Sequence, residues 1–349
     1  MSPSRPAKVK LPHLPQLVRS KLDKVNYTRG ASNRELFQNR VSRNNRVLIN
    51  WESWSLCKFP DDETEEYEKG FCVLVSPSWY FENPNADEEL AAEGIEIGTN
   101  AVIFFQRRQD WEVYSPKGGV LSNGKEFTPA NSRENPVGGT YCARIHATVS
   151  DGATSIEEGF NSNKTRGAGI RVYEYASSQT MADAELQLEA MLWHCYDAEE
   201  VMIDENMSPI DVSLRKGHQL EEARQRGLLN IERLQTVRMI DRESNTVCPL
   251  CLERISATDF FKRSKQADGR ETYDLTTTEI SLFHIQELRV GNLLHKSYNL
   301  GWGHHFCNVV AKDAGIIPTL KWMKSVLDNQ PQDETMDEAK HSVEQAVEG

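Results

Sequence analysis

Two short pairs of candidate metal ligands, far apart in the chain, constrain the fold more than any other feature. The first pair is Cys248 and Cys251, in CPLC, and the second is His304 and Cys307, in GHHFCN. Two ligands at x2 spacing can lie on one tight turn and bind the same tetrahedral zinc ion. The four together leave no open position, so the sequence predicts a structural Zn²⁺ that joins two distant segments. His305 is an alternative to His304 with a less suitable spacing, and two unrelated turns with buried thiols are the non-metal alternative.

Three further polar residues lie between and beside these pairs. His284 ends an apolar string, EISLFHI, and is followed by Asn299 and then Asn308, with 14 and 8 residues between successive members. An imidazole with its usual pKa of about 6.5 is neutral and basic near pH 7, which suits a general base. Asn299 could hold a hairpin in shape, and Asn308 could offer its amide oxygen to a hard cation such as Mg²⁺. The alternative is that His284 is an ordinary strand histidine.

Together, CPLC, FHI, YNL and GHHFCN resemble the HNH, or ββα-metal, endonucleases, in the variant whose last histidine is asparagine. The resemblance covers residues 247–324, and with an unrelated N-terminal half the chain resembles a type II restriction endonuclease of the BstXI kind. It implies that His284 is the general base, that Asn299 braces the hairpin, and that Asn308 binds a catalytic Mg²⁺ beside the structural Zn²⁺.

One position departs from that family. Many members carry a second metal ligand directly before the base, where this chain has Phe283. Phenylalanine cannot bind a cation, so either Asn308 holds the ion with phosphate and water alone or an acid from elsewhere contributes. Asp274 and Glu279 are the nearest acids, and the sequence does not choose between them.

The resemblance implies sequence-specific cleavage of double-stranded DNA by Mg²⁺-dependent phosphodiester hydrolysis. Since enzymes that read symmetric sites are usually symmetric dimers, we expect a homodimer or a higher homo-oligomer. The alternatives are a non-catalytic zinc module that binds DNA, which Phe283 favours, and another HNH nuclease, either homing or modification-dependent.

Charge is distributed unevenly along the chain. The net charge is −12, yet residues 1–50 hold eleven Lys or Arg against two acids, whereas residues 51–110 hold fourteen acids against four bases. An acidic protein can still bind a phosphate backbone through one basic surface. The candidate DNA-binding residues lie within the motif and in the glycine-containing loop 161–171, and they are Arg289, Lys296, Lys312, Lys164, Arg166 and Arg171. The loops QRRQDW and SPKGG are further candidates.

The pattern of apolar residues divides the 349-residue chain into five parts. Strings rich in β-branched and aromatic residues, separated by turn residues, predict a β-rich domain, and a helical period follows it. The predicted fold class is α+β: a basic N-terminal arm with helices (1–50), a β-rich DNA-recognition domain (51–180), a helical connector (181–243), a zinc-stapled HNH domain (244–327) and an acidic disordered tail (328–349). The segment 83–94 is expected to be an acidic loop, and a helix is expected over residues 217–239.

Bulk properties exclude some classes. No run approaches the roughly 18 apolar residues of a membrane helix. The N-terminus lacks the apolar core of a secretory signal, so we expect a cytoplasmic protein with no membrane partner. Cysteines in such a chain are usually reduced. Cys57, Cys72, Cys142 and Cys195 are therefore expected to be structural thiols.

Overall fold

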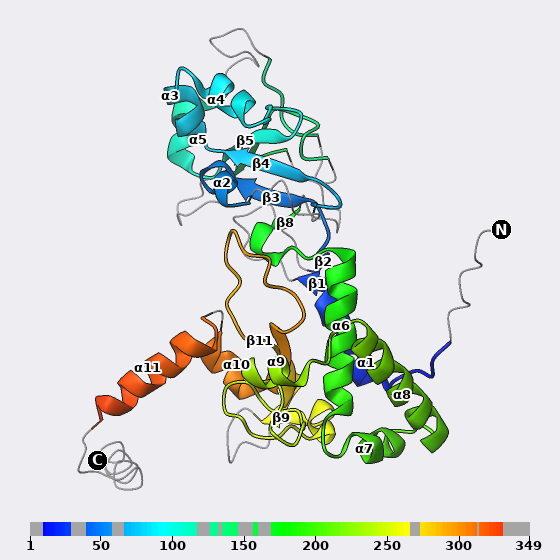
Figure 1. Ribbon diagram of the computed structural model, residues 1–349. Coiled ribbons are helices and arrows are strands. Elements are labelled where there is room, and N and C mark those ends of the chain that lie inside the picture. Colours follow the sequence, from blue (N-terminus) through cyan, green and yellow to red (C-terminus); the bar gives the residue numbers. More distant parts are fainter. Residues whose placement is uncertain are drawn as a thin grey trace, which may run out of the picture.

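The structure of the chain is a computed structural model in which two regions follow one another along the long direction of the molecule (Figure 1). We call residues 41–175 the sheet region, and residues 178–330 together with the first helix the hairpin region. The described residues are 10–28, 40–57, 66–116, 126–131, 135–145, 156–159, 169–265, 273–312 and 314–330.

A six-stranded sheet forms the sheet region, in the order β7-β6-β5-β4-β3-β8. All neighbouring pairs are parallel except β6 with β7. The strands are β3 (Val47–Asn50), β4 (Phe71–Val75), β5 (Ala101–Phe105), β6 (Tyr141–Ile145), β7 (Ile156–Glu158) and β8 (Ile170–Arg171). Since β3 to β6 follow sequence order while β8 returns beside β3, the strand order reverses between β3 and β8.

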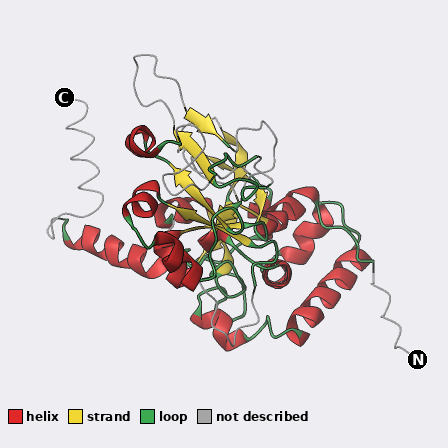
Figure 2. Ribbon diagram, turned by 90° about the horizontal axis from the view of Figure 1, so that it is seen from above, coloured by secondary structure: helices red, strands yellow, loops and turns green. Residues whose placement is uncertain are grey.

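The central strands are apolar on both faces, as strands buried within parallel sheets are. Val73, Ile103 and Phe105 pack on one face, and Leu74 and Phe104 on the other. The first face is covered by helices that follow the strands (Figure 1): α3 (Pro77–Glu82), α4 (Ala86–Ala92) and α5 (Arg108–Tyr114). Figure 2 shows the molecule from above, with strands in yellow and helices in red.

These helices correct the expected β-rich domain. The aromatic residues after β4 and β5 lie in helices, because their strings also carry helix-start signals. Ser76, for example, accepts a hydrogen bond from the Trp79 amide at the start of α3, where Pro77 occupies the first turn. The segment 83–94, expected as a loop, contains α4. Short elements complete this region: β2 (Val41–Ser42), η2 (Trp51–Ser53), α2 (Trp54–Cys57) and η3 (Val172–Glu174). Strand β2 pairs with β1 (Tyr27–Thr28), which precedes the region in the chain.

A mostly buried helix, α6 (Ser178–Trp193), connects the two regions. It packs against α1 (Gln16–Leu22), η1 (Asp23–Asn26) and α8 (Pro209–Gln225). Two shorter helices, α7 (Ala198–Asp204) and α9 (Ile231–Thr236), complete the connector. The single helix expected over residues 217–239 is wrong. The chain breaks at Gly227, whose φ of +70° ends α8 in the left-handed region that favours glycine.

The last part contains an antiparallel hairpin followed by two helices. Strands β11 (Ile280–His284) and β12 (Leu300–His304) pair from Ile280 opposite His304 to His284 opposite Leu300. Trp302 is buried, and its indole donates to the Leu188 carbonyl of α6. The remaining elements are η4 (Ala257–Phe260), β9 (Arg263–Lys265), β10 (Tyr273–Thr278), α10 (His305–Ala311) and α11 (Ile316–Asp328).

The loop between β11 and β12, orange in Figure 1, reaches from the hairpin to the sheet region. Val290 and Leu293 of this loop pack with the cluster that holds Cys57 and Ile170. The two regions therefore meet at a loop that begins directly after His284.

Two expectations about the chain's environment can be compared with the structure. The four cysteines expected as structural thiols are all buried. Among the described residues, no helix is both long and apolar enough to cross a bilayer. The acidic tail beyond Gln330 and residues 1–9 and 29–39 of the basic arm lie outside the described residues.

Candidate metal centre and nuclease site

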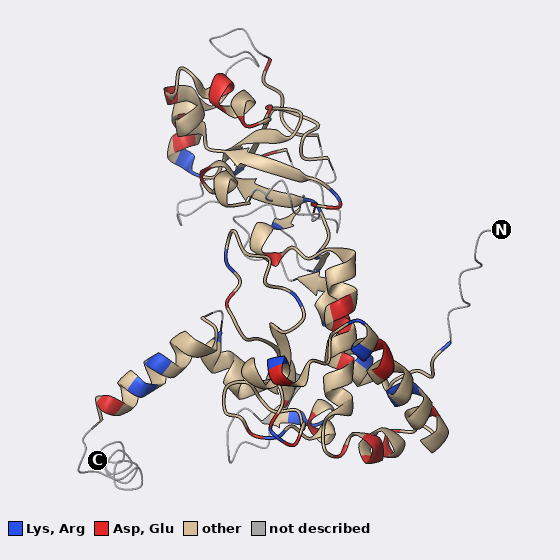
Figure 3. Cartoon of the chain, in the orientation of Figure 1, with Lys and Arg blue, Asp and Glu red and all other residues tan. Residues whose placement is uncertain are grey.

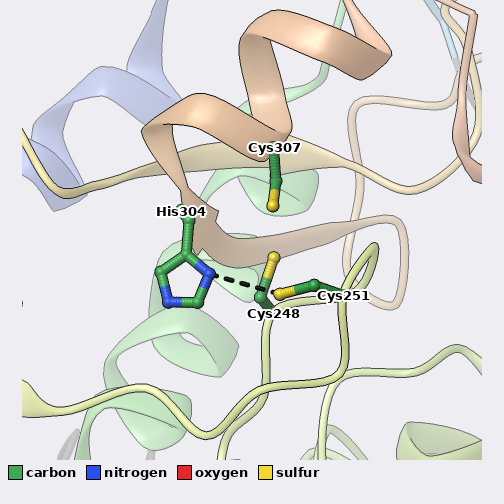
Figure 4. A group of neighbouring side chains, drawn as sticks. All are labelled: Cys248, Cys251, His304 and Cys307. Carbon is green, nitrogen blue, oxygen red and sulfur yellow. Dashed lines mark hydrogen bonds between the residues drawn. The ribbon is translucent and has the colours of Figure 1, made fainter. Parts of the chain in front are cut away.

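Four side chains converge at the end of the hairpin (Figure 4). One donor atom from each of Cys248, Cys251, His304 and Cys307 lies within 4.8 Å of the others, and Cys251 Sγ is 3.3 Å from His304 Nδ1. A tetrahedral zinc ion with Zn–S distances of about 2.3 Å separates its ligand atoms by roughly 3.8 Å. The cluster therefore has the donor set and the dimensions of a closed zinc site. The histidine in it is His304, so the alternative His305 is not needed.

Local structure explains why these residues meet. In the knuckle the Leu252 amide donates to the Cys248 carbonyl, and Leu252 adopts a φ of +65° to close the turn. On the other side, α10 begins directly after β12, so His304 ends the strand and Cys307 lies in the first helical turn. Each pair is therefore set by its own turn, and the tertiary fold has only to bring two turns together.

Hydrogen bonds within the cluster lower the pKa of one cysteine, Cys248, whereas burial and hydrogen bonds raise the pKa values of Cys251 and Cys307. The pKa of Cys248 is lowered to about 3, chiefly because the Cys307 thiol donates a hydrogen bond to it. The pKa of His304 is raised, chiefly by its hydrogen bond with Cys248. The cluster thus stabilises a thiolate, which is the form of cysteine that binds zinc.

His284 ends β11 and is partly buried, next to a second histidine. Its Nε2 lies 3.1 Å from His295 Nδ1, and His295 Nε2 lies 2.9 Å from the Val25 carbonyl oxygen. Burial, and then the nearby charge of Arg43, lower the pKa of His284 to about 3. His284 is therefore a neutral imidazole across the physiological pH range.

Asn299 holds the loop between β11 and β12 closed. Its buried side chain accepts a hydrogen bond from the Gln286 amide at 2.7 Å and donates to the Leu294 carbonyl at 2.7 Å and the Gln286 carbonyl at 3.3 Å. One amide thus satisfies backbone groups at both ends of the loop that follows His284, which is the geometry of a brace.

Asn308 lies in α10 and reaches back to β11. Its amide nitrogen donates to Ser281 Oγ and to the Leu282 carbonyl, both at 3.2 Å. A carbonyl only accepts, so the nitrogen must face Leu282 and the amide oxygen points elsewhere. Asn308 therefore contacts β11 at Ser281 and Leu282, shortly before His284 ends the strand.

The position before the base is closed to a ligand. Phe283 is fully buried against Gly303, where a β-carbon would come within 2.7 Å of the Phe283 ring. Glu279 precedes Ile280, at the other end of the strand, roughly 16 Å from His284 at about 3.3 Å per residue. The side chain of Asp274 lies outside the described residues. Within the described part of the chain, no second group of three or more His, Cys, Asp or Glu side chains converges as the zinc ligands do.

A pocket of about 110 Å³ lies where the two regions meet, at the carboxyl ends of the parallel strands. Its floor is apolar, with Leu74 and Phe104, and Asn50 and Gln106 extend the same faces of β3 and β5 beyond it. Ligands of open parallel sheets bind at such edges, where the strand order reverses. The other residues that line it are Leu48, Ser53, Arg171, Val172, Tyr173 and Val290 of the hairpin loop.

The predicted DNA-binding residues are dispersed. Arg171 contributes to this pocket, with its guanidinium 5.7 Å from the centre of the Tyr173 ring. The described basic residues of the motif are exposed, and Arg289 makes an ion pair with Glu287. Basic residues also lie on the loop between β11 and β12 and on α11 (Figure 3). Lys296 and Lys312 are likewise exposed, whereas Lys164 and Arg166 lie outside the described residues.

Two residues at this site were not identified from the sequence. His295 is a single histidine in a loop, and Arg43 is one of many basic residues in the N-terminal arm, so neither has a motif around it. Arg43 is buried and pairs with Glu174 at 2.5 Å. Only the fold brings them beside His284.

Comparisons with known proteins identify the family of this chain. The model of the BstXI restriction endonuclease family matches residues 20–305. The chain therefore belongs to the BstXI restriction endonuclease family. A solved structure described as a type II restriction endonuclease is 15% identical, with a TM-score of 0.27, and the match covers 45% of this chain and 57% of that one. A search of curated proteins found no match.

Proposed function

We propose that this protein is a type II restriction endonuclease that makes sequence-specific double-strand breaks in DNA through a ββα-metal unit built from β11, β12 and α10. One observation carries the proposal: in a member of the BstXI family, His284, Asn299 and Asn308 lie on a hairpin and helix that a Cys₃His cluster joins. Antiparallel strands followed directly by a helix are the elements that such a unit requires.

His284 acts as the general base in this proposal. Its imidazole is neutral at physiological pH, and the negative charge of a bound phosphate would raise its pKa toward the range that a general base needs to accept a proton from the attacking water. Asn299 keeps the loop after His284 in one conformation through its three hydrogen bonds to backbone groups. The amide oxygen of Asn308 would hold Mg²⁺, which when bound neutralises charge on the phosphate and on the leaving oxygen.

Zn²⁺ would be structural. Its four protein ligands leave no position for water or substrate, so it supplies no chemistry to hydrolysis. It would fix the first turn of α10 to the knuckle that contains Cys248 and Cys251. Because Asn308 directly follows Cys307, the zinc site also positions the proposed Mg²⁺ ligand.

DNA recognition is assigned to the pocket at the carboxyl edge of the parallel sheet. Asn and Gln side chains can form paired hydrogen bonds with the edge of adenine, and Asn50 and Gln106 are exposed at this edge. Arg171, predicted from the sequence, lies in the same pocket. Arg289, Lys296 and Lys312 would bind backbone phosphates, which positions DNA without reading its sequence.

We expect the active form to be a homodimer. In the described part of each chain, one hairpin carries the proposed general base, and a double-strand break requires two hydrolysed phosphodiesters. Two copies related by a twofold axis would present one site to each strand. Sedimentation should therefore give about twice the chain mass of 39.7 kDa, and a monomer bound to its DNA site would contradict this part of the proposal.

A simple assay tests the proposal against its alternative. The buried Phe283, where a metal ligand could stand, favours a non-catalytic zinc protein that only binds DNA. Purified protein is incubated with plasmid and Mg²⁺, with and without EDTA. Discrete fragments that require Mg²⁺ support the endonuclease. DNA binding without cleavage in any divalent cation supports the alternative.

A further inference from the structure

We propose that His295 is a positioning residue that fixes His284 in one tautomer, with the proton on Nε2 and the free lone pair on Nδ1. The catalytic meaning of this inference rests on the proposed function, because it concerns the proposed general base. The tautomer itself follows from two contacts and the charge of His295, none of which depends on that function.

The first contact is between His295 and the backbone. His295 Nε2 lies 2.9 Å from the carbonyl oxygen of Val25, in η1. A carbonyl has lone pairs and no proton, so it can only accept. His295 must therefore carry a proton on Nε2 and donate it to Val25.

The second step concerns the charge of His295. The ring is almost fully buried, and burial together with the neighbouring Arg43 lowers its pKa well below the usual value. Arg43 is itself buried and pairs with Glu174, so its charge stays close to both histidines. His295 is consequently neutral, and since its proton is on Nε2, its Nδ1 is an acceptor.

The second contact, between His295 and His284, determines which nitrogen of His284 carries the proton. His284 Nε2 is 3.1 Å from His295 Nδ1, with the ring centres 5.3 Å apart. Because His295 Nδ1 can only accept, His284 Nε2 must carry the proton and donate. His284 Nδ1 is left with the lone pair, and this is the nitrogen that would deprotonate water.

The proposed proton transfer requires only His284, water and the DNA phosphate. An O–H bond of the attacking water breaks, its oxygen forms a bond to phosphorus, and the proton moves to His284 Nδ1. The bond from phosphorus to the leaving sugar oxygen breaks, and that oxygen takes a proton from solvent. The resulting imidazolium still donates from Nε2 to His295, so the contact is kept when the positive charge forms.

Paired substitutions of His295 separate positioning from simple structural support. The amide of Asn places its oxygen near the position of histidine Nδ1, whereas the amide of Gln places its nitrogen near Nε2. His295→Asn can keep the acceptor for His284, and His295→Gln can keep only the bond to Val25. We expect His295→Gln to lower the single-turnover cleavage rate by about 100-fold or more, the usual contribution of a positioned base, and His295→Asn to retain most of it.

A purely structural role would give the opposite order, because only Gln preserves the bond to the backbone. Cleavage by His295→Gln that equals or exceeds that of His295→Asn, with both variants folded, would overturn the inference. DNA binding in Ca²⁺ should be the same for both variants, because the residue at position 295 is not proposed to contact DNA.

A spectroscopic measurement tests the tautomer in the unaltered protein. With ¹⁵N-labelled histidine, two-bond ¹H–¹⁵N correlations show which ring nitrogen carries the proton. We expect His284 to be protonated on Nε2 alone, and protonation on Nδ1 would overturn the inference even if all variants failed to fold. If His284→Ala still cleaved DNA, the proposed function would fail, whereas the spectrum would still decide the tautomer.

Discussion

The sheet region and the hairpin region are stabilised in different ways. In the sheet region, five-residue apolar strands such as β4 and β5 lie side by side and bury both faces. In the hairpin region, two strands face a short helix, and an isolated two-stranded hairpin is marginally stable in water. The hairpin therefore depends on contacts with α6 and on the Cys₃His cluster, whereas the sheet has a core of its own.

Because of this difference, the two proposed activities lie in regions of different stability. The proposed catalytic residues lie on the part that needs external support, and the proposed recognition pocket lies on the part that does not. The two meet at the loop between β11 and β12, where Val290 lines the pocket and the same loop carries His295. Substitutions in one region should therefore affect one property more than the other.

The largest effect is expected in the hairpin region. His284→Ala should reduce cleavage by about 1,000-fold or more, since general bases contribute roughly 10²- to 10⁴-fold. Binding to DNA should remain, because the ring contacts His295 and not the exposed basic residues. Single-turnover cleavage and a binding titration in Ca²⁺ measure the two effects. The exposed His13→Ala is the matched control, and cleavage by His284→Ala at the control rate would contradict the assigned base.

Removal of zinc should affect the two regions unequally. Structural zinc in small domains contributes an apparent free energy of about 10–16 kcal/mol, which is comparable to the whole stability of a typical domain, about 5–15 kcal/mol. Strong chelation, or Cys251→Ser, should therefore unfold α10 and the hairpin and leave the sheet region protected in hydrogen exchange. Cys57→Ala, in the sheet region, should keep the zinc content at one ion per chain. Equal loss of protection in both regions would show that the stability of the sheet region also depends on zinc.

A smaller effect is expected at the brace of the loop. Asn299→Ala would remove three hydrogen bonds to backbone groups of Gln286 and Leu294. Each such hydrogen bond contributes about 0.5–1.5 kcal/mol, so the hairpin region should lose about 2–4 kcal/mol in the free energy of unfolding. Asn299→Asp keeps the acceptor for Gln286 and should lose less. Denaturant unfolding measures both variants, and an alanine variant as stable as the parent would exclude the brace.

The smallest effect is expected in the sheet region. Asn50→Ala combined with Gln106→Ala should weaken discrimination between the preferred and altered sites by about 1–3 kcal/mol for each lost base contact. The hydrolysis step and zinc content should not change, because neither residue contacts the hairpin site. Competition between cognate and altered duplexes measures discrimination, with exposed Gln179→Ala as the control. Unchanged discrimination would show that Asn50 and Gln106 do not read the DNA sequence.

Local spacing predicted part of the site well. The pairs Cys248 with Cys251 and His304 with Cys307 meet as expected, because x2 spacing acts through a single turn. The strand positions were also recognisable from their apolar strings. Their helices were not, because strings such as PSWYFE combine aromatic residues, which favour strands, with helix-start signals, and tertiary packing decided between them.

The amino-acid sequence by itself determined which short segments can bind a tetrahedral ion and which strings are buried strands. These properties depend on neighbouring residues, so they are set by local geometry. Only the tertiary structure decided that β8 returns beside β3, that Asn50 and Gln106 share a pocket, and that Val25, His284 and His295 form a chain of hydrogen bonds. Such contacts join residues that are far apart in the chain, and they form because packing two regions together buries surfaces that no local pattern specifies.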